Sequence, residues 1–254
     1  MLKTERMDRV RAALRAQGLT QMIVCDPKSV WYLTGVAVEP YERLLALYLP
    51  TEGEPVLFLN RLFNVPEPPC RTVWHTDTDK PVAQIAEVVD AGKPLGIDKE
   101  WPAKFLIPLM ETHPGMQVVL SSDCVDDCRA CKDAEEQALM REASRINDAV
   151  NEAAKHYIKA GMTEREVAEF IDAQFRAHGC EEPSFTTIVS FGANAADPHH
   201  EPDDTVLKEG DCVLFDMGCV KSRYCSDMTR TWFCGQPTEK QAAVHDLVRR
   251  ANEA

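Results

Sequence analysis

The sequence has no long apolar segment. It contains no run of about eighteen apolar residues, the length that a membrane-spanning helix needs. The first eighteen residues are charged and amphipathic, without the apolar core of a secretory signal peptide. Internal repeats and low-complexity stretches are absent as well, so a repeat architecture is not expected. These absences predict a cytoplasmic protein that does not bind membranes.

Basic residues are also in short supply. The chain has 28 Lys and Arg against 41 Asp and Glu, a formal net charge of -13. Binding to phosphate backbones requires a basic surface, so nucleic acid is not the expected partner. The acidic excess is explained by solubility alone and carries no information about mechanism.

Cysteine, by contrast, is frequent, with 10 in 254 residues. The chain is too long for a small disulfide scaffold, so reduced and mostly buried thiols are expected. Cys124, Cys128 and Cys131 have a C-x3-C-x2-C spacing that also occurs in radical iron–sulfur enzymes. Their place in a polar segment between two domains, rather than after the first strand of a barrel, favours plain thiols.

The pattern along the chain predicts two domains, 1–124 and 125–254. The first alternates helix-like and strand-like segments, which indicates an α/β domain around a central sheet. The second opens with two helices, whose starts are marked by Asp133 with Glu136 and by Thr163 with Glu166. Strands are then expected in 186–192, 211–218 and 223–235, followed by a helix in 238–254.

Two aspartates in the predicted strands form a candidate metal site. Asp216 lies in an alternating, half-buried segment, and Asp227 follows eleven positions later, beyond a stretch that can turn the chain. A hairpin would place the two roughly opposite each other, about 5 Å apart at Cβ. Two such carboxylates repel unless a cation lies between them. Alternatively, one aspartate caps a turn and the other pairs with Arg230; spacing alone leaves both possibilities open.

The segments SFTTIVSFGANAADPHHEP, LKEGDCVLFDMG and YCSDMTRTWFCGQP occur in this order. Together they resemble the family of Xaa-Pro aminopeptidases, Xaa-Pro dipeptidases (prolidases), creatinases and methionine aminopeptidases. Upstream, WYLTG, ERLLALYLPTEGEPVLFLN and LGIDKEW resemble the N-terminal domain of the creatinase and prolidase branch, which methionine aminopeptidases lack. The resemblance implies an α/β creatinase-like N-terminal domain followed by an α+β pita-bread catalytic domain whose C-terminal part is missing.

In that family two Asp, one His and two Glu hold two divalent metal ions. By motif, Asp216 resembles the first metal-binding aspartate and Asp227 the second. His199 resembles the histidine that lies beside the metals and contacts the substrate. The other three ligands come from segments that this chain does not contain, so we expect a fragment that binds metal weakly. Mn is the expected metal, with Co and Zn as alternatives.

Four further residues are candidates for substrate binding or for support of the metal site. His200 follows His199, and Tyr224 and Arg230 flank Asp227. Phe185 precedes a predicted strand and could also belong to the core. The resemblance implies a homodimeric metallopeptidase that hydrolyses Xaa-Pro dipeptides or peptides. Both aspartates disfavour a creatinase, which lacks them. The alternative is a metal-free pita-bread protein that serves as a binding module.

Overall fold

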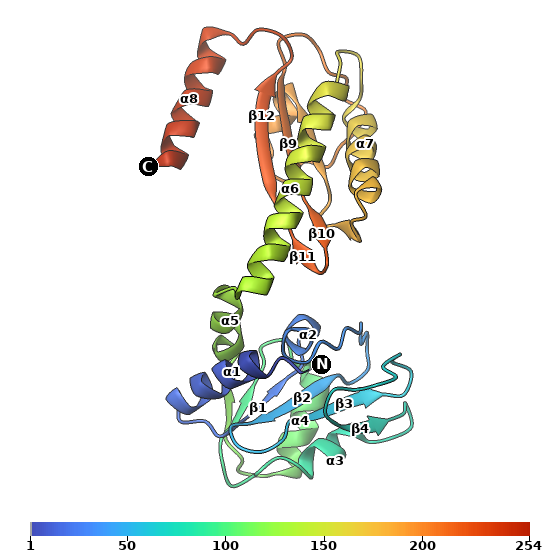
Figure 1. Ribbon diagram of the computed structural model, residues 1–254, viewed down its shortest axis with the longest axis vertical. Coiled ribbons are helices and arrows are strands. Elements are labelled where there is room, and N and C mark those ends of the chain that lie inside the picture. Colours follow the sequence, from blue (N-terminus) through green and yellow to red (C-terminus); the bar gives the residue numbers. More distant parts are fainter. Residues whose placement is uncertain (1) are drawn as a thin grey trace. The chain divides into compact units, whose positions relative to one another are not determined.

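The computed structural model describes residues 2–254, and these form two compact units, Met1–Lys132 and Asp133–Ala254 (Figure 1). The predicted boundary between residues 124 and 125 falls inside helix α5 (Asp123–Ala130). Cys124, Val125 and Cys128 of α5 pack into the core of the first unit, so that unit extends to the end of this helix. Among the described residues, no helix combines the length and the apolarity needed to cross a bilayer.

The first unit is built on a mixed sheet of six strands in the order β4-β3-β2-β1-β5-β6. The strands are β1 (Gln21–Val24), β2 (Ala46–Pro50), β3 (Val56–Asn60), β4 (Arg71–His75), β5 (Leu95–Ile97) and β6 (Val118–Leu120). Strands β1, β2 and β3 pair antiparallel, whereas the β1–β5, β5–β6 and β3–β4 pairs are parallel.

Helices cover both faces of this sheet. Successive side chains of a strand point to opposite faces, and Met22 and Val24 accordingly lie in one core while Ile23 and Cys25 lie in the other. The first core receives residues of α1 (Thr4–Ala16), α2 (Pro27–Thr34) and α5, and the second receives those of α3 (Pro81–Ala86) and α4 (Ala103–Thr112). The predicted α/β domain is confirmed.

Three elements of the first unit differ from expectation. Helix α2 was not predicted, although Asp26 caps it by accepting hydrogen bonds from the backbone N–H groups of Lys28 and Ser29. Strand β4 was not predicted either, because its five residues do not alternate clearly. Helix α3 ends at Ala86, whereas the apolar pattern that follows Pro81 predicts a helix over residues 80–91.

The second unit combines helices α6 (Ala134–Tyr157) and α7 (Glu164–Ala177) with two small antiparallel sheets, β12-β9-β8 and β11-β10-β7. Its strands are β7 (Glu182–Pro183), β8 (Ile188–Phe191), β9 (Cys212–Met217), β10 (Cys219–Lys221), β11 (Tyr224–Cys225) and β12 (Met228–Phe233). A 3-10 helix, η1 (Gly192–Ala196), follows β8, and the chain ends with α8 (Glu239–Glu253).

Capping boxes start the helices of this unit where the sequence predicted them. Asp133 with Glu136 and Thr163 with Glu166 form reciprocal side chain–backbone bonds at the starts of α6 and α7. Thr238 forms a third such box with Gln241 at the start of α8. Each box satisfies backbone N–H groups that a helix start leaves without partners.

Strand β9 has one face in the core and one face that is half-exposed. Val213, Phe215 and Met217 are buried among residues of α6 and α7, as Figure 1 shows for the helices beside the sheet. The alternate residues of β9, which include Asp216, are only partly covered. The Asn147 side chain of α6 also donates to the carbonyl of Met217 at 2.9 Å, which ties the strand to the helix.

The core face of β9 should control the stability of the second unit. Phe215 is fully buried and its ring meets that of Trp232 edge-on, with centroids 4.6 Å apart. We expect Phe215→Ala to lower the free energy of unfolding by about 3–5 kcal/mol, because it removes a large core side chain. Urea unfolding followed by circular dichroism measures the change. Val244→Ala on the exposed α8 is the control, with an expected change within about 0.5 kcal/mol.

Cys124, within α5, and Cys131, at the C-terminal end of this helix, should differ sharply in reactivity. Burial raises the pKa of the Cys124 thiol to about 11, whereas Cys131 is exposed. Since the thiolate is the reactive form, iodoacetamide at pH 8 should modify Cys131 well before Cys124, as peptide mass mapping would show. Equal labelling of the two in the folded protein would contradict the buried position of Cys124.

Candidate active site

Asp216 occupies the middle strand of a three-stranded sheet. Strand β9 pairs with β8 on one side and β12 on the other, where Asp216 faces Ile188 and Thr229. Two ladders therefore fix its backbone. Its Oδ1 atom is buried and has no hydrogen-bond partner in the described part of the chain. A buried carboxylate oxygen without a donor is costly, and a cation bound at this oxygen would offset that cost. The local structure thus fits a metal ligand.

Asp227 lies just before β12, and its position follows from the register of the hairpin. The β9–β12 ladder pairs Met217 with Met228, and the β10–β11 ladder pairs Val220 with Cys225. Both ladders have the same register, which sets Asp227 beside Gly218. The two aspartates are therefore diagonal neighbours, typically about 7–8 Å apart at Cα. The sequence predicted that they lie roughly opposite each other, and the register of the ladder offsets them by two positions.

The register is set by the turn between β10 and β11. Its central residues, Ser222 and Arg223, have φ values of 51° and 67°. Two successive residues with positive φ define a two-residue type I′ turn, whose twist matches that of the paired strands. Glycine and asparagine normally mark such turns in a sequence, and neither is present here. The position of the turn could therefore not be deduced from the sequence.

Gly218 permits the close approach of the chain beside Asp227. A Cβ atom at this position would lie 2.0 Å from the carbonyl oxygen of Ser226 and 2.2 Å from the hydroxyl of Ser184. Neither distance is tolerable, so no larger residue fits without moving the backbone. Asp227 itself is exposed. Among residues 2–254, no ion pair joins it to Arg230, whose guanidinium donates to the carbonyl of Thr229.

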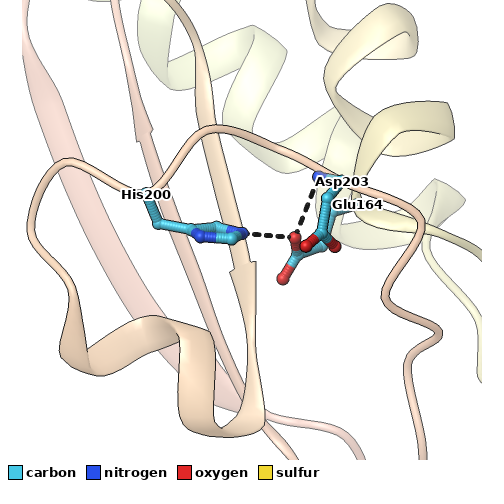
Figure 2. Close-up of side chains that lie close together, drawn as sticks. All are labelled: Glu164, His200 and Asp203. Atoms are coloured by element: carbon cyan, nitrogen blue, oxygen red, sulfur yellow. Dashed lines mark hydrogen bonds and ion pairs between the residues drawn. The ribbon is translucent and has the colours of Figure 1, made fainter.

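The loop between β8 and β9 carries the two predicted histidines, and it is held by Glu164, the first residue of α7 (Figure 2). Glu164 Oε1 accepts hydrogen bonds from the backbone N–H of Phe191 at 2.7 Å and from the side chain of Asn194 at 3.0 Å. Its Oε2 bonds to His200 Nε2 at 2.7 Å and to the backbone N–H of Asp203 at 3.2 Å.

His199 and His200 have different surroundings. The side chain of His200 is 15% exposed and contacts Glu164, whereas His199 is exposed and its backbone N–H donates to Asp197 at 3.0 Å. His199 is thus accessible to a substrate, while His200 is committed to the base of the loop. The sequence marked the start of α7 but gave no sign that Glu164 is buried, so this residue was missed.

Ligand atoms of Glu164, His200 and Asp203 lie within 4.8 Å of one another, a spacing at which they could hold a metal ion. Each oxygen of Glu164, however, already accepts two hydrogen bonds. Hydrogen bonds from the side chain and backbone of Thr205 lower the pKa of Asp203, which keeps this carboxylate ionised. The carboxylates of Glu164 and Asp203 therefore have hydrogen-bond donors within the protein, without a metal ion.

Two other candidates, Tyr224 and Phe185, lie in or beside the strands of the second unit. The Tyr224 hydroxyl donates to Glu136 Oε1 at 3.0 Å, which links β11 to the capping box of α6. Phe185 is half-buried between β7 and β8. Their roles in substrate binding remain predictions, as does that of Arg230.

The fold and the aspartate hairpin define a two-domain metallopeptidase, and comparison with known proteins shows the same class. Residues 6–131 match the creatinase/prolidase N-terminal domain, and residues 138–254 match metallopeptidase family M24. An uncharacterised peptidase of Staphylococcus epidermidis is 30% identical over 246 residues, covering 95% of this chain and 70% of that protein.

Solved structures agree with these sequence matches. A prolidase from Thermococcus sibiricus has a TM-score of 0.89 at 30% identity, covering 100% of this chain and 71% of that one. The dipeptidase PepE from Mycobacterium ulcerans has a TM-score of 0.90 at 30% identity, covering 99% and 70% respectively. The chain belongs to metallopeptidase family M24 and carries the creatinase-type N-terminal domain. It spans about 70% of the length of these relatives.

Metal binding at Asp216 should be visible as thermal stabilisation. A ligand that binds only the folded state stabilises it by about 1.4 kcal/mol at ten times its Kd. We expect millimolar Mn²⁺ to raise the Tm of the wild type by a few degrees and to leave that of Asp216→Asn unchanged, as measured by differential scanning fluorimetry. Asp246→Asn on α8 makes the same charge change away from the hairpin and should keep the shift. An equal shift in Asp216→Asn would rule out this site.

Proposed function

We propose that the protein is a metal-dependent exopeptidase that hydrolyses the Xaa-Pro bond, of the aminopeptidase P or prolidase type. The observation that carries the proposal is the buried Oδ1 of Asp216, which has no donor among residues 2–254 and lies in a segment that matches this family. Asp227, on the same hairpin, supplies a second carboxylate within reach of shared cations.

Each residue has a distinct task in this proposal. Asp216 and Asp227 would hold two divalent ions, which lower the pKa of a bound water and polarise the scissile carbonyl. Asp216 is fixed by two ladders, so its carboxylate needs little reorganisation on binding. His199, exposed on its loop, would donate a hydrogen bond to the carbonyl oxygen as negative charge develops there.

Specificity for proline is supported by the relatives and by the chemistry of the bond. Structures similar to this chain include a prolidase and a dipeptidase. The Xaa-Pro bond is a tertiary amide without an N–H group. A peptidase that recognises its substrate through the N–H of the scissile bond cannot bind an Xaa-Pro bond, so a dedicated site is required. We propose that Phe185, His200, Tyr224 and Arg230 surround the substrate or support the metal site.

The resemblance and the sequence also support finer proposals. Mn²⁺ suits carboxylate and imidazole ligands and is the expected metal, with Co²⁺ and Zn²⁺ as alternatives. The substrates are Xaa-Pro dipeptides or longer peptides, and nucleic acid is not a partner. We further propose a cytoplasmic homodimer.

Activity is best tested with the protein extended by any sequence that follows Ala254 in its gene. We expect hydrolysis of an Xaa-Pro dipeptide or a longer Xaa-Pro peptide with Mn²⁺, none after EDTA treatment, and little with the matched Xaa-Ala substrates. Released amino acids are measured by chromatography. Asp216→Asn should lower kcat by about 100-fold or more, since even residues that only support a metal ligand cost about 10- to 100-fold.

Asp246→Asn is again the control and should keep full activity. If Mn²⁺ binds but Xaa-Ala and Xaa-Pro peptides are cleaved equally, the proline specificity is wrong. If neither metal binding nor hydrolysis is found, the metal-free binding module becomes the better description.

A further inference from the structure

Glu164 has an unusual environment for a carboxylate at a helix start. Its side chain is completely buried, and burial of a charged group is costly unless hydrogen bonds compensate for it. An ionised carboxylate offers about four acceptor positions, and four donors occupy them, two on each oxygen. Because the carboxylate can only accept, His200 Nε2 must carry a proton and donate it to Glu164.

The four donors come from both sides of His199 in the chain. Phe191 ends β8 and Asn194 belongs to η1, whereas His200 lies one position and Asp203 four positions after His199. Figure 2 shows that His200 and Asp203 approach the same carboxylate from the loop. One side chain of α7 therefore anchors both ends of the segment that presents His199.

We infer that Glu164 is a positioning residue that fixes the loop of residues 191–203 and thereby the place of His199. The inference deepens the proposed function and rests on the substrate role given to His199 there. Glu164 does not touch the substrate in this arrangement. It acts through His200 and through three other donors.

A metal ion in the Glu164–His200–Asp203 cluster is the competing explanation. Such an ion would take the lone pairs of Glu164 that now accept hydrogen bonds. It would also need an unprotonated His200 Nε2, whereas the hydrogen-bonded arrangement assigns a proton to this nitrogen, which lies 2.7 Å from Glu164 Oε2. The hydrogen-bonded arrangement is therefore favoured, and metal binding is an outcome that the experiment must detect.

Glu164→Gln tests the inference with almost no change in size. The amide keeps one acceptor oxygen but replaces the other with a donor, which then faces donors of the loop. Glu166→Gln is a matched control, because it makes the same change two positions later on the same helix turn. Among residues 2–254, the Glu166 carboxylate accepts hydrogen bonds from the backbone and side chain of Thr163, and glutamine preserves a capping box.

The first readout is the NMR spectrum of histidine ring nitrogens in the 254-residue protein, which requires no peptidase activity. We expect a protected Nε2–H signal from His200 in the wild type. Glu164→Gln should lose this signal and shift the His199 ring, while Glu166→Gln should change neither. Unchanged histidine signals in Glu164→Gln would overturn the inference. So would selective broadening of the His200 signals by sub-stoichiometric Mn²⁺, which would identify a metal site.

The second readout is catalysis by the metal-loaded, gene-extended protein. Displacement of a substrate-positioning group typically costs about 10- to 100-fold in rate, and we expect a fall of this size in kcat with little change in KM. A purely structural role for Glu164 would lower the Tm and leave kcat per folded molecule unchanged, which would overturn the inference. If the wild type itself is inactive, the proposed function fails while the NMR result still decides the role of Glu164.

Should Glu164→Gln not fold cooperatively, Asn194→Ala gives the same test. This change removes one donor to Oε1 and leaves the carboxylate in place. The His199 ring signal should shift again, by less than in a folded Glu164→Gln. No shift would overturn the inference.

Discussion

The antiparallel ladder between β9 and β12, continued by β10 and β11, is the constraint on which the site depends. It aligns the two aspartates through a chain of backbone hydrogen bonds that starts at the turn of Ser222 and Arg223. A shift of one residue would send Asp216 to the core face, where it would displace an apolar side chain. Burial of Val213, Phe215 and Met217 makes such a shift expensive. The packing of the core and the positions of the two aspartates are thus fixed by one register.

A second constraint acts on the loop beside this ladder. Without an anchor, the residues between β8 and β9 would lose much conformational entropy if His199 bound a substrate as proposed. The buried Glu164 removes part of that cost in advance, because its four donors hold the loop in the folded protein. The positions of the two aspartates therefore depend on strand pairing, whereas the position of His199 depends on Glu164 at the start of α7.

Much of this arrangement could be predicted from residue patterns. Alternation of apolar residues revealed β9, and the capping pairs at Asp133 and Thr163 located the starts of two helices. The motif around Asp216 and Asp227 pointed to the family, which the comparisons confirm. These features are local, so a short window of sequence contains them.

Features that depend on distant contacts could not be predicted. The offset of two positions between the aspartates arises from a turn with no glycine or asparagine to reveal it. The burial of Glu164 arises from contact with residues up to 39 positions away. The domain boundary was placed too early because the polar surface of α5 hid the side chains with which it joins the first core.

The two faces of β9 also have a consequence for how this protein can vary. Apolar residues on the covered face can exchange with one another, provided that the packed volume is kept, and the backbone under Asp216 stays where the neighbouring strands hold it. The opposite face can change its polar and charged groups without disturbing the core. Substitutions that affect packing and substitutions that affect chemistry thus fall on different faces of this strand. Relatives that share this framework can therefore diverge in the reactions they favour.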